Sequence, residues 1–141
     1  MVSDVFGEVG IAATYGLVGL VLMAVGFALV DILTPGNLRE QIWVERNRNA
    51  AILLATNLIG VGIIVATAIA ASQGNLGEGL LSTAAYGLLG LVLMALSFVV
   101  LDAVTPGKLG ELLVAEEPHP AVYVNASSHI AVSAIVAVAI F

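Results

Sequence analysis

One passage of about 27 residues occurs twice in this chain. Residues 14–40 and 85–111 align without a gap at an offset of 71 residues, and 16 of the 27 aligned positions are identical. Two helices that shared only an apolar composition would not agree so often. Self-similarity at a fixed offset is the signature of a repeated structural unit. We therefore predict a first repeat over residues 1–73 and a second repeat over residues 74–141.

The spacing of the charged residues shows what kind of unit is repeated. Four windows of more than 20 residues contain no Asp, Glu, Lys or Arg, and the whole chain is 60% hydrophobic and only 10% charged. A helix rises 1.5 Å per residue, so about 20 apolar residues cross the roughly 30 Å of hydrocarbon in a bilayer. We predict an all-α, polytopic membrane protein that forms one integral-membrane domain. Its four transmembrane helices are expected at about residues 10–30, 49–72, 80–101 and 120–141.

The basic residues predict how these helices are oriented. Arg39, Arg46, Arg48 and Lys108 are the only basic residues, and all four fall in the two linkers that follow the first and third spans. Positively charged loops stay in the cytoplasm, which predicts cytoplasmic linkers and both termini outside. Each repeat contains two spans, so both copies must have the same orientation. This is a parallel twofold repeat, related by an axis along the membrane normal.

Each linker opens with the same three residues and then shows helical spacing of its apolar side chains. Threonine followed by proline is a favourable N-cap and first-turn pair. We therefore expect a short amphipathic helix at the membrane surface in each linker, starting at this motif. The motif consists of Thr34, Pro35 and Gly36 in the first copy and Thr105, Pro106 and Gly107 in the second.

Glycines recur at helical spacing inside the predicted spans. Lipid provides no hydrophobic drive for helices to associate, so close backbone approach through small residues supplies much of it. We interpret these glycines as helix-packing positions. They are Gly16, Gly19, Gly26, Gly60, Gly87 and Gly90.

Asp31 and Asp102 occupy matched positions at the C-terminal ends of their spans. The helix dipole disfavours an anion there by about 0.3–1 kcal/mol, so each carboxylate needs a compensating partner. One interpretation is structural: the carboxylate accepts backbone N–H bonds from the Thr-Pro-Gly turn or pairs with a linker arginine. The other is a cation or proton site at the cytoplasmic end of a pathway.

His129 is the one titratable side chain well inside a span. Asn125, Ser128 and His129 share one helix face, which must look into the bundle and not into lipid. A neutral imidazole bonded to Asn57 or to a serine would satisfy this face, and a proton relay is the functional alternative. A metal site is disfavoured because His119, the only other histidine, lies too far along the helix. We predict no metal and no cofactor.

Several classes of function find no support in the sequence. Four basic residues cannot form a nucleic-acid-binding surface, and the chain has no cysteine for thiol or iron–sulfur chemistry. No phosphate-binding loop, His-Glu-x-x-His motif or nucleophile elbow is present, so no enzymatic activity is expected. The first hypothesis is a non-catalytic subunit that packs in the lipid bilayer with itself or with another membrane protein. The alternative is a small channel or proton-linked transporter along the pseudo-twofold axis.

The doubled Asp-x-x-Thr-Pro-Gly motif, with Glu45-x-x-x-Asn49-Ala50 opening the second span, resembles the bacterial membrane proteins grouped under domain of unknown function 350. The resemblance covers essentially the whole chain. It implies a four-helix, twofold-repeat protein of the bacterial inner membrane, and it implies no established activity. In the second copy, residues 118–121 read Pro-His-Pro-Ala, so a role of Asn49 is not expected to be duplicated.

Overall fold

The computed structural model describes residues 1–72 and 74–140, and in these residues every regular element is an α-helix. Four helices are long and apolar enough to cross a membrane. Two short helices lie in the linkers. In chain order the six are α1 (Val2–Leu33), α2 (Leu38–Trp43), α3 (Arg48–Ala71), α4 (Leu76–Val104), α5 (Leu109–Leu113) and α6 (Ala121–Ile140). The predicted all-α class with four candidate transmembrane helices is thereby confirmed.

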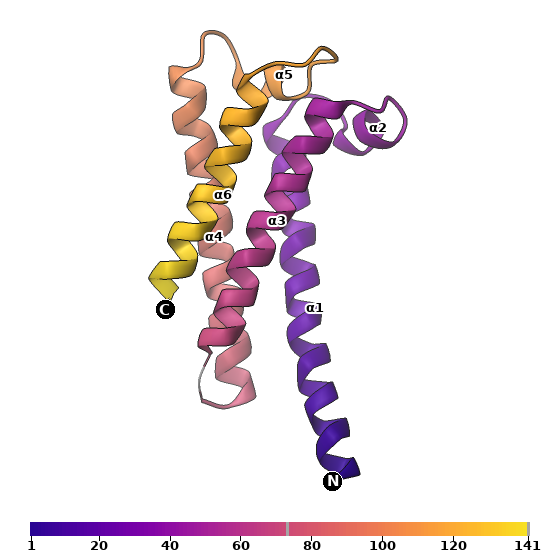
Figure 1. Ribbon diagram of the computed structural model, residues 1–141, viewed down its shortest axis with the longest axis vertical. Coiled ribbons are helices and arrows are strands. Elements are labelled where there is room, and N and C mark those ends of the chain that lie inside the picture. The colour runs from indigo at the N-terminus through magenta and orange to yellow at the C-terminus, as the bar shows by residue number, and fades with distance from the viewer. Residues whose placement is uncertain (73, 141) are drawn as a thin grey trace.

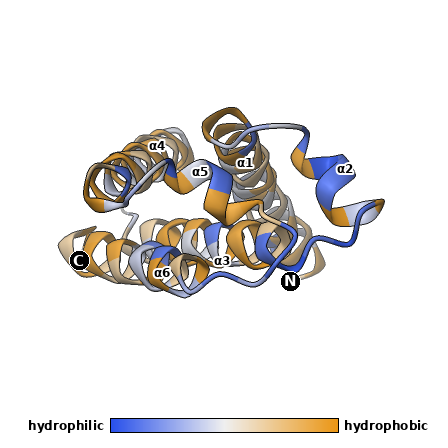
Figure 2. Cartoon of the chain, turned by 90° about the horizontal axis from the view of Figure 1, so that it is seen from above, coloured by the Kyte–Doolittle hydropathy of each residue, from blue (hydrophilic) through white to orange (hydrophobic). Residues whose placement is uncertain are grey.

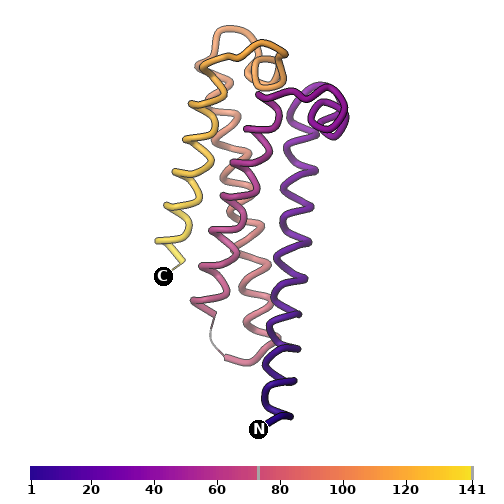
Figure 3. The backbone as a smooth tube through the Cα atoms, turned by 45° about the vertical axis from the view of Figure 1, so that its right-hand side comes forward, coloured from indigo at the N-terminus to yellow at the C-terminus, as the bar shows by residue number. Residues whose placement is uncertain are grey.

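The four long helices run side by side as a bundle (Figures 1 and 3). Both linkers, with α2 and α5, lie at one end of the bundle. The connection from α3 to α4 lies at the other end, toward which the N-terminus and α6 also point. Seen from the linker end, α1 and α4 form one layer and α3 and α6 the other (Figure 2). Helix α3 packs against all three other long helices, most extensively against α6.

The outward faces of the long helices are as apolar as their inward faces (Figure 2). Leu17, Leu20, Val92 and Ile135, for example, are all exposed. A soluble bundle would place polar residues on these faces, whereas a helix that is hydrophobic all round belongs in a membrane. Only 22% of the most apolar window of α1 is buried inside the chain, against 44% for α3. Most of the surface of α1 is therefore left open by the rest of the chain, whereas α3 is surrounded more by its own chain.

Two predicted spans are shorter than the helices that contain them. Helix α1 begins at residue 2 and not near residue 10, and α4 covers residues 76–104 and not only 80–101. Charged residues end the hydrocarbon-crossing part of a helix, but they do not end the helix itself. An acidic residue in the first turn even favours the N-terminus of a helix, as Asp4 does in α1 and Glu78 in α4. The other two spans agree with α3 and α6 to within one residue, except that residue 141 lies outside the described residues.

The prediction that Thr-Pro starts each linker helix is wrong. Thr34 ends α1, because its backbone N–H and its hydroxyl both donate to the carbonyl of Val30. The residue before a proline is biased toward extended backbone, and Thr34 has φ −113° and ψ 148°. The linker helices begin later, with Asn37 as the N-cap of α2 and Lys108 as the N-cap of α5.

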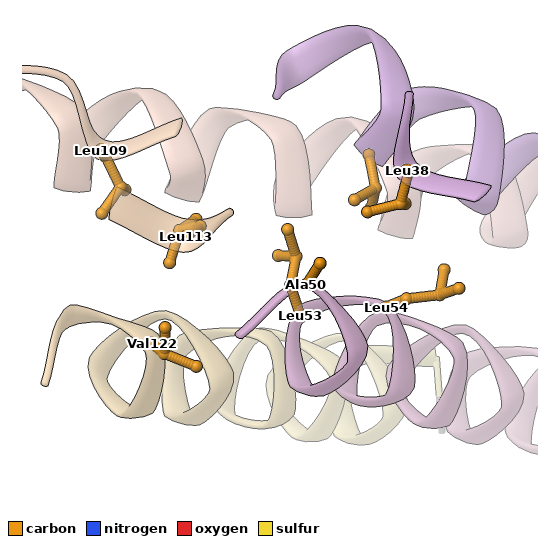
Figure 4. Close-up of a cluster of buried hydrophobic side chains, with 8 residues drawn as sticks. Leu38, Ala50, Leu53, Leu54, Leu109, Leu113 and Val122 are labelled. Carbon is orange, nitrogen blue, oxygen red and sulfur yellow. The ribbon is translucent and has the colours of Figure 1, made fainter. Parts of the chain in front are cut away.

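The core consists of two clusters. The one at the linker end joins residues of the long helices to Leu38 of α2 and to Leu109 and Leu113 of α5, three leucines that are at most 2% exposed (Figure 4). Burying a leucine side chain stabilises a fold by about 1.5–3 kcal/mol relative to leaving it in water. The short helices are thereby held against the bundle end. The second cluster fills the middle of the bundle and comprises Leu22, Val61, Ile64, Val65, Leu91, Met94 and Val136.

Candidate functional site

The two repeated aspartates make the same hydrogen bond in both copies. The Oδ1 atom of Asp31 accepts the backbone N–H of Leu38 at 2.9 Å, and that of Asp102 accepts the N–H of Leu109 at 2.8 Å. Each carboxylate therefore binds the first residue of the short helix that follows, a position favourable for an anion. The partner lies just beyond the Thr-Pro-Gly turn and not within it. No ion pair to Asp31 or Asp102 occurs among residues 1–72 and 74–140.

The glycine of the linker motif has a conformational role. Gly36 has φ +84° and Gly107 has φ +89°, in the left-handed region where a side chain is strained. Each glycine follows a proline that has stopped the long helix. The motif therefore reverses the chain and brings the start of the short helix back to the aspartate. Its repetition is explained by this turn without any ligand.

Two asparagines at the start of α3 bind the opposite linker. Asn47 donates its side-chain N–H to the carbonyl of Val114 at 2.7 Å. Asn49 donates to the carbonyls of Ala115 at 3.0 Å and Glu117 at 2.7 Å. Both side chains are buried. They tie the first linker to the segment between α5 and α6, and the sequence alone does not reveal this contact.

A row of polar side chains on α6 faces the interior of the bundle. The sequence predicted this for Asn125 and His129 but not for Ser133. Asn125, His129 and Ser133 are at most 4% exposed and lie four residues apart, so they follow one stripe of the helix. The Nδ1 atom of His129 lies 3.4 Å from the hydroxyl of Thr56 on α3, so within the described residues its ring hydrogen-bonds a threonine and not Asn57 or a serine, as was expected. Ser133 donates to the carbonyl of His129 at 2.6 Å.

Ser128 and Asn125, predicted to share this site, have different surroundings. Ser128 is only partly buried and hydrogen-bonds the hydroxyl of Ser97 on α4. Asn125 is 1% exposed, and neither its Oδ1 nor its Nδ2 has a hydrogen-bond partner within the described part of the chain. Leaving such a group unpaired costs about 1–3 kcal/mol.

Asn57 and His129 are the two predicted site residues that the fold brings together. Both line a small, partly open cavity of about 20 Å³ between α1, α3, α4 and α6. Asn57 donates to the sulfur of Met94 at 3.8 Å, while its buried Oδ1 has no partner among the described residues. A cavity of this size has room for one water molecule. Asp31 and Asp102 do not line it, so the predicted polar positions do not converge on one pathway.

Five of the six predicted packing glycines make close contacts within the chain. An added Cβ at Gly19 would lie 3.3 Å from Val65, and one at Gly26 would lie 3.0 Å from the Oδ1 of Asn57. An added Cβ at Gly60 would collide with Met94 and Ser133. One at Gly87 would collide with Leu22, and one at Gly90 would collide with Ile64. Gly16 differs, because it is exposed and no atom lies within 4 Å of an added Cβ. It does not pack inside this bundle.

Four apolar membrane-length helices, joined by linkers at one end and holding a sparse polar row in their interior, define a polytopic integral-membrane helix bundle. The profile of the family described as Domain of Unknown Function (DUF350) matches residues 4–140, and the chain belongs to this family. Its predicted membership is thereby confirmed. The family description states no activity.

Three curated proteins are similar to nearly the whole chain. The UPF0719 transmembrane proteins of Mycobacterium bovis and Mycobacterium tuberculosis are each 38% identical over 133 residues, covering 93% of this chain and 88% of each relative. The UPF0719 transmembrane protein of Mycolicibacterium paratuberculosis is 35% identical over 126 residues, covering 89% and 83%. No solved structure matches. The relatives agree with a bacterial transmembrane protein.

Proposed function

We propose that this protein is a non-catalytic membrane subunit that packs, through the outward face of α1, against a second copy of itself or another membrane protein. The observation that supports this proposal is a difference between two matched glycines. Gly87 of α4 lies against Leu22 of α1, whereas Gly16, 71 residues earlier, lies on an exposed face of α1 with no neighbour.

The surroundings of Gly16 support the same proposal. Ala12 and Gly16 form a small-xxx-small pair, the spacing that lets two membrane helices approach closely. Both are exposed, and so is every residue from Met1 to Ala13. In the second copy the matched pair is Thr83 and Gly87, and both are buried inside the bundle. A pair that packs in one repeat is thus left open in the other.

The matched glycines also give the test. Gly16→Leu adds a side chain in open space, so the monomer is expected to fold normally while its association weakens by about tenfold or more. Gly87→Leu places a side chain onto Leu22 and is expected to destabilise the monomer itself. Association is measured by energy transfer between labelled copies in lipid vesicles and by mass determination in mild detergent.

The outcomes separate the two kinds of partner. Loss of self-association in Gly16→Leu supports a homo-oligomer. If the wild type is monomeric, co-purification of another membrane protein that Gly16→Leu no longer retains supports a hetero-complex. A wild-type protein that is a lone monodisperse monomer and retains nothing contradicts the proposal.

We also propose how the protein is oriented in the bacterial inner membrane. The two linkers face the cytoplasm, and the end of the bundle that carries Met1 faces the outside of that membrane. The proposal is supported by the segregation of charge: the four basic residues all belong to the linker end. The acidic residues Asp4 and Glu8 belong to the start of α1, and Glu78 belongs to the first turn of α4. These two helix starts lie at the opposite end of the bundle (Figure 1).

Transport is a second candidate, favoured by the cavity that Asn57 and His129 share. A pathway for protons or small ions would pass this cavity between the four long helices. Proton or ion flux into vesicles tests it, with His129→Ala and Asn57→Ala as variants of the cavity and Asp31→Asn as a control outside it. Flux that is absent in the wild type, or that equals the wild-type flux in both cavity variants, removes this assignment.

A further inference from the structure

The two linker helices sit differently on the bundle although they occupy matched positions in the repeats. Helix α5 packs against α3, α4 and α6, whereas α2 packs chiefly against α3. Figure 2 shows α5 over the middle of the bundle and α2 at its side. A difference in sequence must account for this, because the turns and the aspartate bonds that precede the two helices are alike.

Among the residues that differ, the pair that changes how closely the helix can approach is Arg39 in α2 and its match in α5, Gly110. Gly110 is buried, and an added Cβ would lie 3.1 Å from the carbonyl oxygen of Leu33 and 3.4 Å from Pro35. Only a residue without a side chain lets α5 come so close to the end of α1. A charged arginine cannot be buried in this way without a partner, and Arg39 is exposed.

An open groove lies beside α2 as a result. Its volume is about 700 Å³, within the range of about 300–1,000 Å³ typical of ligand sites. Phe27 forms its apolar part on α1, six residues or about 9 Å before the end of that helix. The remaining lining residues come from α2 and its two caps: Asn37, Arg39, Glu40, Trp43 and Val44.

The polar part of the groove carries one positive and one negative charge. Arg39 and Glu40 are both exposed, and neither takes part in an ion pair within residues 1–72 and 74–140. Asn37 accepts the backbone N–H of Glu40 at 3.2 Å, which fixes the start of the helix that carries both charges. Trp43 is 65% exposed, as expected for an aromatic residue at the level of lipid headgroups.

We propose that this groove binds a membrane phospholipid whose headgroup has a phosphate and a primary amine, that is, a phosphatidylethanolamine. The phosphate binds the guanidinium of Arg39, and the ammonium group binds the carboxylate of Glu40. One acyl chain lies along Phe27 and α1. A purely anionic headgroup would meet the repulsion of Glu40, and a quaternary amine has no N–H to donate to it.

The single tryptophan of the chain, Trp43, provides the measurement. The protein is reconstituted in phosphatidylcholine vesicles that contain the same low mole fraction of brominated phosphatidylethanolamine, phosphatidylglycerol or phosphatidylcholine. Brominated acyl chains quench tryptophan on contact. We expect the ethanolamine lipid to be enriched about fivefold at Trp43 over the other two, which corresponds to about 1 kcal/mol.

Two variants identify the charges. In Glu40→Gln the preference for the ethanolamine lipid over phosphatidylcholine is expected to disappear, and in Arg39→Gln quenching by both ethanolamine and glycerol lipids is expected to fall. Glu111→Gln changes the matched glutamate of the second repeat and should leave quenching as in the wild type. Quenching that follows mole fraction alone in the wild type, whatever the headgroup, overturns the proposal even if a variant fails to fold.

Discussion

At the scale of single residues, Asn49 has the clearest energetic role. Its side chain donates to two carbonyls of the opposite linker, and its match in the second repeat is Pro120, which has no side-chain donor. Asn49→Ala is expected to lower the free energy of unfolding by about 1–2 kcal/mol, because two carbonyls of the opposite linker lose the buried amide that donates to them. Denaturant titration in detergent micelles measures this.

The control for Asn49→Ala is Ser127→Ala. Ser127 is exposed and donates only to the carbonyl of Tyr123 in its own helix, so its loss should change stability by less than about 0.5 kcal/mol. Equal effects of the two substitutions would contradict the role given to Asn49.

Asn125 is expected to behave in the opposite way. Both of its side-chain polar atoms are buried without a partner in the described part of the chain. Asn125→Leu replaces the amide with an apolar group of the same branching and is therefore expected to stabilise the protein by about 1 kcal/mol, measured by thermal unfolding in detergent. A loss of stability would indicate that this amide is satisfied by a partner outside the chain.

How far such residues could be predicted depends on the distance between partners in the sequence. The inward face of α6 followed from the spacing of Asn125 and His129, because both lie on one helix. Thr56, the partner of His129, is 73 residues away. To find this partner, one must know how far α3 and α6 are shifted relative to each other along their axes. Side-chain packing determines this shift, and the spacing of hydrophobic residues in the sequence does not reveal it.

At the scale of helices, all four spans were predicted, but the N-terminal ends of α1 and α4 were placed too late in the sequence. The start of α4 did carry a signal: Asn75 accepts the backbone N–H of Glu78 at 2.9 Å, as an N-cap followed three residues later by glutamate should. The start of α1 is harder to predict. Its first turns pack against nothing and are fixed only by local helix preference.

The contrast between α5 and α2 leads to a prediction for whole elements. Gly110→Ala brings a Cβ to 3.1 Å from the carbonyl of Leu33, so α5 must move outward at a cost of about 1–3 kcal/mol. Arg39→Ala, at the matched position of α2, removes an exposed side chain and should change stability by less than about 0.5 kcal/mol. Unfolding in detergent micelles compares the two. Similar effects would mean that the glycine does not determine where α5 sits.

At the scale of the whole molecule, the sequence repeat predicted the common end of the two linkers, and the structure places them there (Figure 3). It could not predict the departures from symmetry, which come from substitutions within the repeat. The first copy has Arg39 where the second has Gly110, and it has Asn49 where the second has Pro120. A chain whose two halves have nearly the same apolar pattern therefore has linker helices that pack differently against the bundle.

Which end faces the cytoplasm can be decided on the intact protein, because the chain has no cysteine and each introduced cysteine is unique. Ser3→Cys and Glu78→Cys report on one end, and Glu45→Cys and Glu116→Cys on the other; all four residues are exposed. The positively charged linkers should remain inside, so an impermeant maleimide is expected to label residues 3 and 78 in intact cells. Residues 45 and 116 should react only after lysis.

Removing an acidic side chain does not disturb the comparison, since acidic residues contribute little to orientation. Labelling of the linker sites in intact cells would reverse the proposed orientation, and labelling of all four would indicate that the protein inserts in both directions.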